Sequence, residues 1–310
     1  MVTLIAGGAH PGLANQIARI LGVELVSMRL SHYPDAEVVR IDASIRGADI
    51  YLVQPTPPPP EGFLVELMLI ADAAARSGAA RVTAVVPYLG YSRQDRRAGG
   101  ERTAVGARVV ANILGSGDID RLVTVDLHQP AVEGFFAMPV EHLEAFPLLL
   151  RALGEVPRDS AVVAPDLGAA KLADRFAAEL QLPMVAVHKT RLTGVDVVAT
   201  RITGEVKGLR PIIVDDMITT GSTVRAAIDA LAAAGSAGLA TVAVTHGILS
   251  PEAPDTLSRL GLGRLLATDS VPLPTEALPS LQVVSLAPLL ANAIQRMHDG
   301  RSLADLRSHR

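Results

Sequence analysis

The sequence predicts an α/β protein made of two tandem doubly wound domains with mainly parallel sheets. Short apolar runs alternate with longer stretches of helical apolar spacing along all 310 residues, as expected of strands that alternate with helices. The pattern occurs twice, and in each half an apolar run ends in an acid just before a loop, at Asp126 and at Asp215. Such repetition indicates diverged copies of one unit. We therefore predict an N-terminal domain over residues 1–144 and a C-terminal domain over residues 145–310.

The predicted elements of the first half follow one another in strand–helix order. Each strand is a short, mostly apolar run, as expected where both faces of a parallel sheet are covered. The strands are Val2–Ala6, Ile50–Gln54, Val82–Pro87 and Leu122–Asp126, and the helices are Pro11–Leu21, Phe63–Ser77 and Ala104–Leu114. Four prolines at 57–60 form a stiff segment. Because a strand and a helix flank this segment, we interpret it as a loop inside one βα unit.

The second half repeats the order. Its strands are Ala161–Pro165, Met184–His188, Pro211–Asp215, Thr241–His246 and Arg264–Thr268, and its helices are Gly168–Leu180, Val224–Ala234, Ala253–Leu260 and Ala287–His298. In an open parallel sheet the loops that leave the carboxyl ends of the strands gather on one edge, where ligands bind. We therefore searched these loops for functional residues.

Composition excludes several classes of function. Lys and Arg total 28 against 32 Asp and Glu, giving a formal charge of -4, so no broad basic face for nucleic acid or acidic lipid is expected. The chain has no cysteine, which excludes disulfides and thiolate chemistry and fits a reducing compartment. The first residues lack the basic region of a signal peptide, and no apolar run is long enough to span a bilayer. We expect a cytoplasmic globular protein with no nucleic-acid or membrane partner.

The segment from Ile212 to Thr223 is the most informative motif. An apolar strand leads into Asp215 and Asp216, and these are followed by Thr219, Thr220, Gly221, Ser222, Thr223 and an alanine-rich helix. The unpaired N–H groups of a helix start and the nearby hydroxyls suit a phosphate, and a glycine lets the backbone approach it closely. The acids are suited to ribose hydroxyls or a metal-bound sugar. The alternative is an ordinary strand–helix junction with a hydroxyl cap, for which the acid pair has no use.

Three other strand-exit loops carry chemistry. The loop from Pro87 to Arg97 contains three arginines and Gln94, which suit a polyphosphate and the edge of a base, unless the charges simply pair with one another. His128 and Asp166 each end a predicted strand. Mg²⁺ prefers oxygen ligands, so Asp166 suits it better, although a structural histidine and a helix cap are the plain alternatives. Lys189 and Arg191 alternate along a strand exit and could stabilise a transferring phosphoryl group or lie on the surface.

Together these motifs, in this order, resemble the ribose-phosphate pyrophosphokinase family. Pro87–Arg97 is similar to its ATP loop, Val125–His128 with Glu133–Phe136 to its second nucleotide block, His188–Arg191 to the start of its catalytic loop, and Val214–Thr223 to its ribose-phosphate loop. The resemblance implies two phosphoribosyltransferase-like domains. It also implies Mg²⁺-dependent transfer of the β,γ-diphosphoryl group of ATP to the anomeric hydroxyl of ribose 5-phosphate. The products would be AMP and phosphoribosyl pyrophosphate, a precursor in nucleotide biosynthesis.

The resemblance also implies a role for each matching residue. Lys189 and Arg191 would be catalytic, and His128 and Asp166 would serve the metal. ATP would be bound by Tyr33, Asp35, Glu37, Arg93, Gln94 and His128, and ribose 5-phosphate by Asp215, Asp216, Thr219, Thr220, Gly221, Ser222 and Thr223. In the family the loop that matches residues 33–37 reads the adenine from a neighbouring subunit, which implies a homo-oligomer.

Several positions depart from the family pattern. Tyr33 replaces a usual Phe, Thr219 a common acid and Ser222 a usual Gly, while residues 98–102 and Pro130 replace positions of an allosteric phosphate or ADP site. Two other functions stay open. One is a non-catalytic homologue that associates with synthetase subunits, and the other is a phosphoribosyltransferase that uses the same sugar loop.

Overall fold

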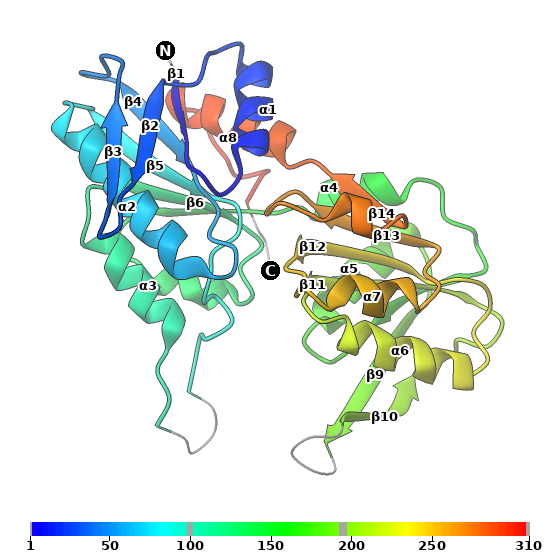
Figure 1. The fold of residues 1–310 in the computed structure, drawn as a ribbon. Helices are drawn as coiled ribbons and strands as arrows, with labels where there is room; N and C mark the ends of the chain where they lie inside the picture. The colour runs from blue at the N-terminus through cyan, green and yellow to red at the C-terminus, as the bar shows by residue number, and fades with distance from the viewer. Residues whose placement is uncertain (1, 98–101, 192–196, 308–310) are drawn as a thin grey trace. The chain divides into compact units, whose positions relative to one another are not determined.

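The computed structural model describes residues 2–97, 102–191 and 197–307, with the side chains of 32, 189–191 and 197–200 left out (Figure 1). The chain divides into two compact units. Unit 1 comprises Met1–Ala145, Ser270–Pro272 and Ser285–Arg310, and unit 2 comprises Phe146–Asp269 and Leu273–Val284. Along the described ranges, no helix is both long and apolar enough to cross a membrane.

The C-terminal segment belongs to unit 1, whereas the sequence placed it in the domain 145–310. Helix α8 (Ala287–His298) packs against α1 (Pro11–Leu21), and His298 Nδ1 lies 2.9 Å from Asp49 Oδ2. An apolar pattern predicts that a helix has a buried face, but it does not say which core buries that face.

Unit 1 is built on a fully parallel sheet in the order β1-β4-β5-β6-β7. Apolar strand residues that are almost completely buried make its core, because helices cover the sheet. The strands are β1 (Val2–Ala6), β4 (Asp49–Val53), β5 (Arg81–Val86), β6 (Arg121–Val125) and β7 (Val140–Leu143), and the remaining helices are α2 (Pro60–Arg76), α3 (Gly106–Gly115) and the 3₁₀ helix η1 (Pro130–Phe135). Helix α2 begins at the last proline of the 57–60 segment, a favourable first helical position, so this segment is a loop within the unit as predicted.

A separate antiparallel hairpin of unit 1 escaped the sequence prediction. It pairs β2 (Met28–His32) with β3 (Glu37–Ile41). Half-buried and exposed residues alternate along β3, so this strand lacks the continuous apolar run that marked the sheet strands. Just before the hairpin, Leu25 bridges Leu4 on the side of β1 that does not face β4.

Unit 2 is built on a sheet in the order β10-β9-β8-β11-β12-β13-β14, parallel except for β10. The strands are β8 (Ser160–Ala164), β9 (Met184–Arg191), β10 (Val197–Thr203), β11 (Arg210–Ile218), β12 (Thr241–Gly247), β13 (Arg264–Thr268) and β14 (Leu281–Val284), and the helices are α4 (Phe146–Leu153), α5 (Ala170–Leu180), α6 (Ser222–Ala233), α7 (Ala253–Ser258) and the 3₁₀ helix η2 (Thr275–Ala277). The two mainly parallel sheets confirm the predicted α/β class.

The strand order of unit 2 reverses between β8 and β11. From β8 the chain moves to β9 on one side and then to β11 on the other. Loops that leave strands at such a switch point diverge and open a crevice for a ligand. The candidate residues Asp166 and Asp215 follow β8 and lie in β11, so the topology places them at this point.

Candidate functional site

The loop between β11 and α6 has the shape of an anion-binding turn. Gly221 is the N-cap of α6 with a φ of 78°, and a Cβ on it would lie 3.0 Å from Leu257 Cδ2, so both backbone and space favour glycine. Ser222 is the first helical residue. A helical backbone accepts a Cβ without strain, which explains how serine is tolerated there. Thr220 Oγ1 accepts the Ser222 N–H at 3.3 Å and donates to Ser222 Oγ at 3.0 Å.

The acid pair lies within β11 and not at its end. Asp215 is paired with Val244, and the ladder continues through Met217 and Ile218. The predicted strand end at Asp215 was therefore three residues too early, because the pattern of apolar residues breaks at the acids although the hydrogen bonding does not. Thr219, Thr220 and Gly221 then make the turn, and Ser222 and Thr223 begin α6.

Asp215, Asp216 and Asp166 form an electrostatically linked group of carboxylates. Burial raises the pKa of Asp215 to about 8, and the charges of Asp216 and Asp166 add to this rise. The Asp216 N–H donates to Asp215 Oδ1 at 2.9 Å. Close acids that resist ionisation lower their energy when a cation or a hydroxyl donor arrives. The chemistry of this group therefore suits a polar, hydroxyl-bearing or metal-bound ligand.

Asp166 is not the helix cap that was the plain alternative, because the N-cap of α5 is Ala169, but Asp166 has another structural role. Its Oδ1 accepts the N–H of Gly168 at 2.9 Å and that of Ala169 at 3.3 Å, which shapes the turn before α5. Within the described residues, no group of three or more His, Asp or Glu side chains is arranged to hold a metal. Mg²⁺ needs only one or two carboxylates when waters and substrate phosphates supply the rest. The hard oxygens of Asp166 and its neighbours fit that requirement.

The predicted ATP loop follows β5 in unit 1 and is anchored at both sides. Arg93 and Gln94 are exposed and help to line a cavity of about 500 Å³ with Tyr88 and Tyr91. The Tyr91 hydroxyl donates to Glu61 of α2, and the Gln94 carbonyl accepts the Ala107 N–H at 3.1 Å. The loop therefore presents an arginine and an amide over a hollow of ligand size.

Self-pairing of the charges in this loop is limited. Arg96 Nε lies 3.8 Å from Asp95 Oδ1, a long contact between partly exposed groups that contributes little free energy. The alternative of a self-paired charge cluster thus applies to Arg96.

Thr56 anchors the predicted ATP loop by hydrogen bonds to Tyr88 and Gly90, and sequence analysis did not identify it. Its Oγ1 accepts the Gly90 N–H at 2.7 Å and donates to the Tyr88 carbonyl at 3.2 Å, while its own N–H donates to that carbonyl at 2.9 Å. A Cβ on Gly90 would lie 2.6 Å from Pro60 Cβ. A single threonine among prolines has no recognisable pattern, so this anchor could only be found in the structure.

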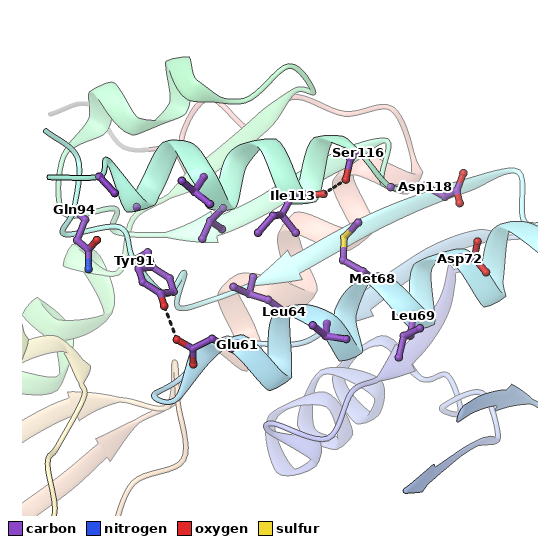
Figure 2. Close-up of a pocket in the computed structure, with 16 residues that line it drawn as sticks. Glu61, Leu64, Met68, Leu69, Asp72, Tyr91, Gln94, Ile113, Ser116 and Asp118 are labelled. Atoms are coloured by element: carbon purple, nitrogen blue, oxygen red, sulfur yellow. Dashed lines mark hydrogen bonds between the residues drawn. The ribbon is translucent and has the colours of Figure 1, made fainter. Parts of the chain in front are cut away.

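An apolar groove of about 690 Å³ lies between α2 and α3. Figure 2 shows Leu64, Met68 and Ile113 along it, with Tyr91 and Gln94 near one end. Tyr91 and Gln94 also line the cavity of the ATP loop. The loop therefore has an apolar side against the helices and a polar side toward the cavity.

The other nucleotide candidates of unit 1 lie on two further segments. His128 is half-buried in the loop after β6, and β6 neighbours β5 in the sheet. Tyr33 and Asp35 lie in the turn of the β2–β3 hairpin and Glu37 begins β3, with Tyr33 59% exposed. Its ring is thus available to stack on a ligand, as the family resemblance requires.

Lys189 and Arg191 lie in β9, where their backbones pair with Ala199 and Val197 of β10. The strand is extended at these positions, as predicted. Their side chains lie outside the described part of the structure. His128 belongs to unit 1 and Asp166 to unit 2, so the two predicted metal residues come from different units.

Comparison with known proteins defines the class and then the family. Residues 2–116 match the N-terminal domain of ribose phosphate pyrophosphokinase, and residues 151–257 match the phosphoribosyl transferase domain. Fold and site thus define a protein built from phosphoribosyltransferase-type domains.

The chain belongs to the ribose-phosphate pyrophosphokinase family of enzymes. It is 39% identical over 309 residues to the ribose-phosphate pyrophosphokinase of Corynebacterium efficiens, covering 98% of this chain and 94% of that protein. The Streptomyces avermitilis protein of the same name is 39% identical over 307 residues, covering 97% and 94%. The crystal structure of phosphoribosylpyrophosphate synthetase from Mycobacterium smegmatis matches with a TM-score of 0.90 and 37% identity, covering 96% of this chain and 99% of that one. These findings confirm the resemblance seen in the motifs.

Proposed function

We propose that this chain transfers the β,γ-diphosphoryl group of ATP to the anomeric hydroxyl of ribose 5-phosphate, giving phosphoribosyl pyrophosphate and AMP. The observation that carries the proposal is the nearly full-length similarity to ribose-phosphate pyrophosphokinases. It is supported by a sugar-phosphate turn in unit 2 and an arginine-bearing cavity in unit 1. Because the chain has no cysteine, which fits a reducing compartment, we also propose a cytoplasmic location.

Ribose 5-phosphate would bind to unit 2. The backbone N–H groups at the start of α6 and the hydroxyls of Thr219, Thr220, Ser222 and Thr223 would hold its phosphate. Asp215 and Asp216 would accept hydrogen bonds from the ribose hydroxyls. These hydrogen bonds would stabilise the two carboxylates, of which Asp215 has a pKa raised to about 8, first by burial and then by the charges of Asp216 and Asp166.

ATP would bind to unit 1. Arg93 offers forked donors for phosphate oxygens and Gln94 can pair with the edge of the base, while His128 would contact the nucleotide from the adjacent loop. Tyr33 would stack on the adenine, with Asp35 and Glu37 at its edge. The family resemblance assigns these three residues to a neighbouring subunit, so we propose a homo-oligomer.

Asp166 and His128 would hold Mg²⁺ at the nucleotide. When bound, the metal would supply positive charge that neutralises the phosphate groups. Lys189 and Arg191 would stabilise the negative charge on the transferring diphosphoryl group. Positioning and fixed charge supply most of the acceleration in such reactions, since little covalent work falls to the protein.

Product analysis separates this proposal from its two rivals. Incubation with ATP, ribose 5-phosphate and Mg²⁺ should yield AMP and phosphoribosyl pyrophosphate in equal amounts, without any nucleobase. A phosphoribosyltransferase would instead consume phosphoribosyl pyrophosphate only when a base is added, and a non-catalytic homologue would form no AMP. The loop residues Arg93 and Gln94 favour the first outcome, because a transferase has no need for an ATP site.

Mixing inactive variants tests the shared adenine site. Tyr33→Ala and Lys189→Ala each damage one part of a site. If Tyr33 serves a neighbouring subunit, mixed oligomers regain sites in which both residues are intact, and activity rises after the two variants are unfolded and refolded together. If Tyr33 serves its own subunit, every site keeps one defect and no recovery occurs.

A further inference from the structure

A backbone turn follows β6, and one buried amide in it, that of Leu127, requires a hydrogen-bond acceptor. The ladder between β6 and β7 ends at Val125 and Leu143. Asp126 follows with a φ of 40°, a left-handed conformation that non-glycine residues adopt only where surrounding contacts hold it. Its N–H still donates to the Leu143 carbonyl at 3.1 Å. The next residue, Leu127, is 2% exposed, so its N–H requires a partner within the protein.

That partner is the imidazole of His142. The Leu127 N–H donates to His142 Nε2 at 2.8 Å, and the His142 side chain is 1% exposed. Because Nε2 accepts this bond, it carries no proton, and the ring proton lies on Nδ1. His142 Nδ1 lies 2.7 Å from Glu133 Oε1, so it donates to that carboxylate. The two bonds fix both the tautomer and the plane of the ring.

Glu133 is in turn held in place by its own segment. It lies in η1, where the Val132 N–H donates to the Gln129 carbonyl at 3.1 Å. Arg108 of α3 donates from Nη1 to the Phe135 carbonyl at 2.6 Å, which ties the end of η1 to a helix of the unit. The carboxylate therefore reaches His142 from a braced position, and the order of contacts runs from α3 through η1 and β7 to the loop after β6.

We propose that His142, oriented by Glu133, is a positioning residue that sets the direction in which His128 leaves β6. A fixed Leu127 N–H fixes the peptide plane between Asp126 and Leu127, and His128 begins one residue later. Side chains that orient a ligating group through hydrogen bonds commonly govern affinity at such sites. The inference rests on the proposed function only for the task of His128. The hydrogen-bond chain itself is independent of it.

Four variants test separately the hydrogen bond from Leu127 to His142 and the one from His142 to Glu133. His142→Leu removes the acceptor for Leu127 and keeps a buried apolar side chain, whereas His142→Gln places an amide oxygen within reach of the same N–H. Glu133→Leu removes the partner of Nδ1, and Glu133→Gln keeps an acceptor without the charge. His298→Leu is the matched control, because it deletes another histidine–carboxylate bond of unit 1, from His298 Nδ1 to Asp49 Oδ2, and leaves Glu133, His142 and η1 unchanged.

Hydrogen exchange at the Leu127 amide in the ligand-free protein is the first readout. His142→Leu should speed this exchange by about tenfold, as the loss of a net hydrogen bond of ordinary strength does, with recovery in His142→Gln and no change in His298→Leu. Unchanged exchange in a folded His142→Leu protein would overturn the proposal. This readout needs no turnover, so it holds even if the proposed reaction fails.

The second readout is kinetic and decides whether the chain reaches His128. His142→Leu should raise the KM for Mg²⁺–ATP by about 10- to 100-fold and leave the KM for ribose 5-phosphate unchanged, with Glu133→Leu intermediate and Glu133→Gln near the parent. Titration of Mg²⁺–ATP without ribose 5-phosphate should show the same loss of affinity. A purely structural role would leave nucleotide affinity unchanged while exchange at Leu127 accelerates, and that result would overturn the positioning role.

Discussion

The two units have a similar order of strands, but one corresponding loop differs in its chemistry. In each, a first strand (β1 or β8) is followed by an antiparallel hairpin and then by a strand that pairs on the far side of the first, β4 in unit 1 and β11 in unit 2. The loop after β11 is the one that we propose binds the sugar phosphate. Its counterpart by position is therefore the loop after β4, from Gln54 to Pro60.

The loop of unit 1 has lost the donors that an anion needs. Five of its residues are prolines, at 55 and 57–60, and proline has no N–H. The N–H groups of Gln54 and Thr56 donate at 2.9 Å to the carbonyls of Val85 and Tyr88. In unit 2 the same place offers a helix start and a row of hydroxyls. The chemistry of these two loops therefore supports a sugar-phosphate site in unit 2 and not at the matching loop of unit 1.

The N–H groups of the loop after β1 are also occupied. The Gly8 N–H donates to Glu66 Oε1 at 2.6 Å and the Ala9 N–H to Gln54 Oε1 at 3.0 Å, and Gln54 Nε2 donates to Glu66 Oε2 at 2.9 Å. In this respect the loop resembles the one after β8, where Asp166 accepts the N–H groups of Gly168 and Ala169. The candidate ligand residues of unit 1 lie on the loops after β5 and β6 and in the β2–β3 hairpin. Similar strand order therefore says where a site can form, and loop chemistry decides what it binds.

Of the variants in unit 2, Lys189→Ala should lower the enzymatic activity most. Loss of a fixed charge at the transferring group lowers kcat by about 100- to 1,000-fold, with much smaller changes in the two KM values, because Lys189 acts mainly in the transition state. Steady-state kinetics measures this. Arg201→Ala, an exposed cation on the paired strand β10, is the control and should be near the parent. A kcat for Lys189→Ala equal to that of the control would remove Lys189 from the mechanism.

Gly221→Ala should raise the KM for ribose 5-phosphate by about tenfold or more, because the added Cβ displaces the turn that positions the phosphate. Gly261→Ala is matched to it: Gly261 also has a positive φ, of 60°, but a Cβ there meets no atom within 4 Å. Both variants should lose about 1 kcal/mol of stability from backbone strain. Equal effects on KM in both would show that the sugar loop does not depend on the shape of Gly221.

Asp215→Asn should change how stability depends on pH. The folded pKa of Asp215 is raised to about 8, so the folded protein binds a proton that the unfolded chain releases above about pH 4. This bound proton contributes fully to the free energy of unfolding in acid, and its contribution is lost as pH rises toward 8. In buffer without divalent cations, the Tm of the parent should fall by several degrees from pH 5 to pH 8.

The Asn variant should lose much of this fall in Tm, since its side chain does not ionise. Asp229→Asn, which removes an exposed carboxylate of α6, should keep it. Parallel curves for the parent and Asp215→Asn would contradict the carboxylate repulsion assigned to the site.

The sequence predicted the architecture well where apolar runs were long and continuous. Nine strands of the two sheets were found, because burial on both faces leaves long apolar runs, but the edge strands β7, β10 and β14 were not predicted. The hydroxyl-rich sequence from Thr219 to Thr223 also marked the junction with α6. The β2–β3 hairpin was missed, since its residues alternate and carry no long apolar run. Family resemblance, and not periodicity, pointed to the loop at Tyr33.

Other features depend on contacts that no local pattern encodes. The assignment of α8 to unit 1 comes from packing against α1. The anchoring of Gly90 by Thr56 joins residues 34 positions apart, and the bond from Leu127 to His142 joins residues 15 apart. Asp166 illustrates a third case, because its hydrogen bonds to the turn before α5 and its predicted metal role use the same carboxyl group.

The most direct test of the division between the two units compares the KM values of Thr56→Val and Gly221→Ala. Thr56→Val keeps the shape of the side chain but leaves the buried Gly90 N–H without its acceptor, which loosens the ATP loop. The account predicts a crossed result: Thr56→Val raises the KM for ATP and leaves that for ribose 5-phosphate unchanged, and Gly221→Ala does the reverse. If Thr56→Val raised the KM for ribose 5-phosphate instead, the loop of unit 1 would still serve the sugar, and the account would be wrong.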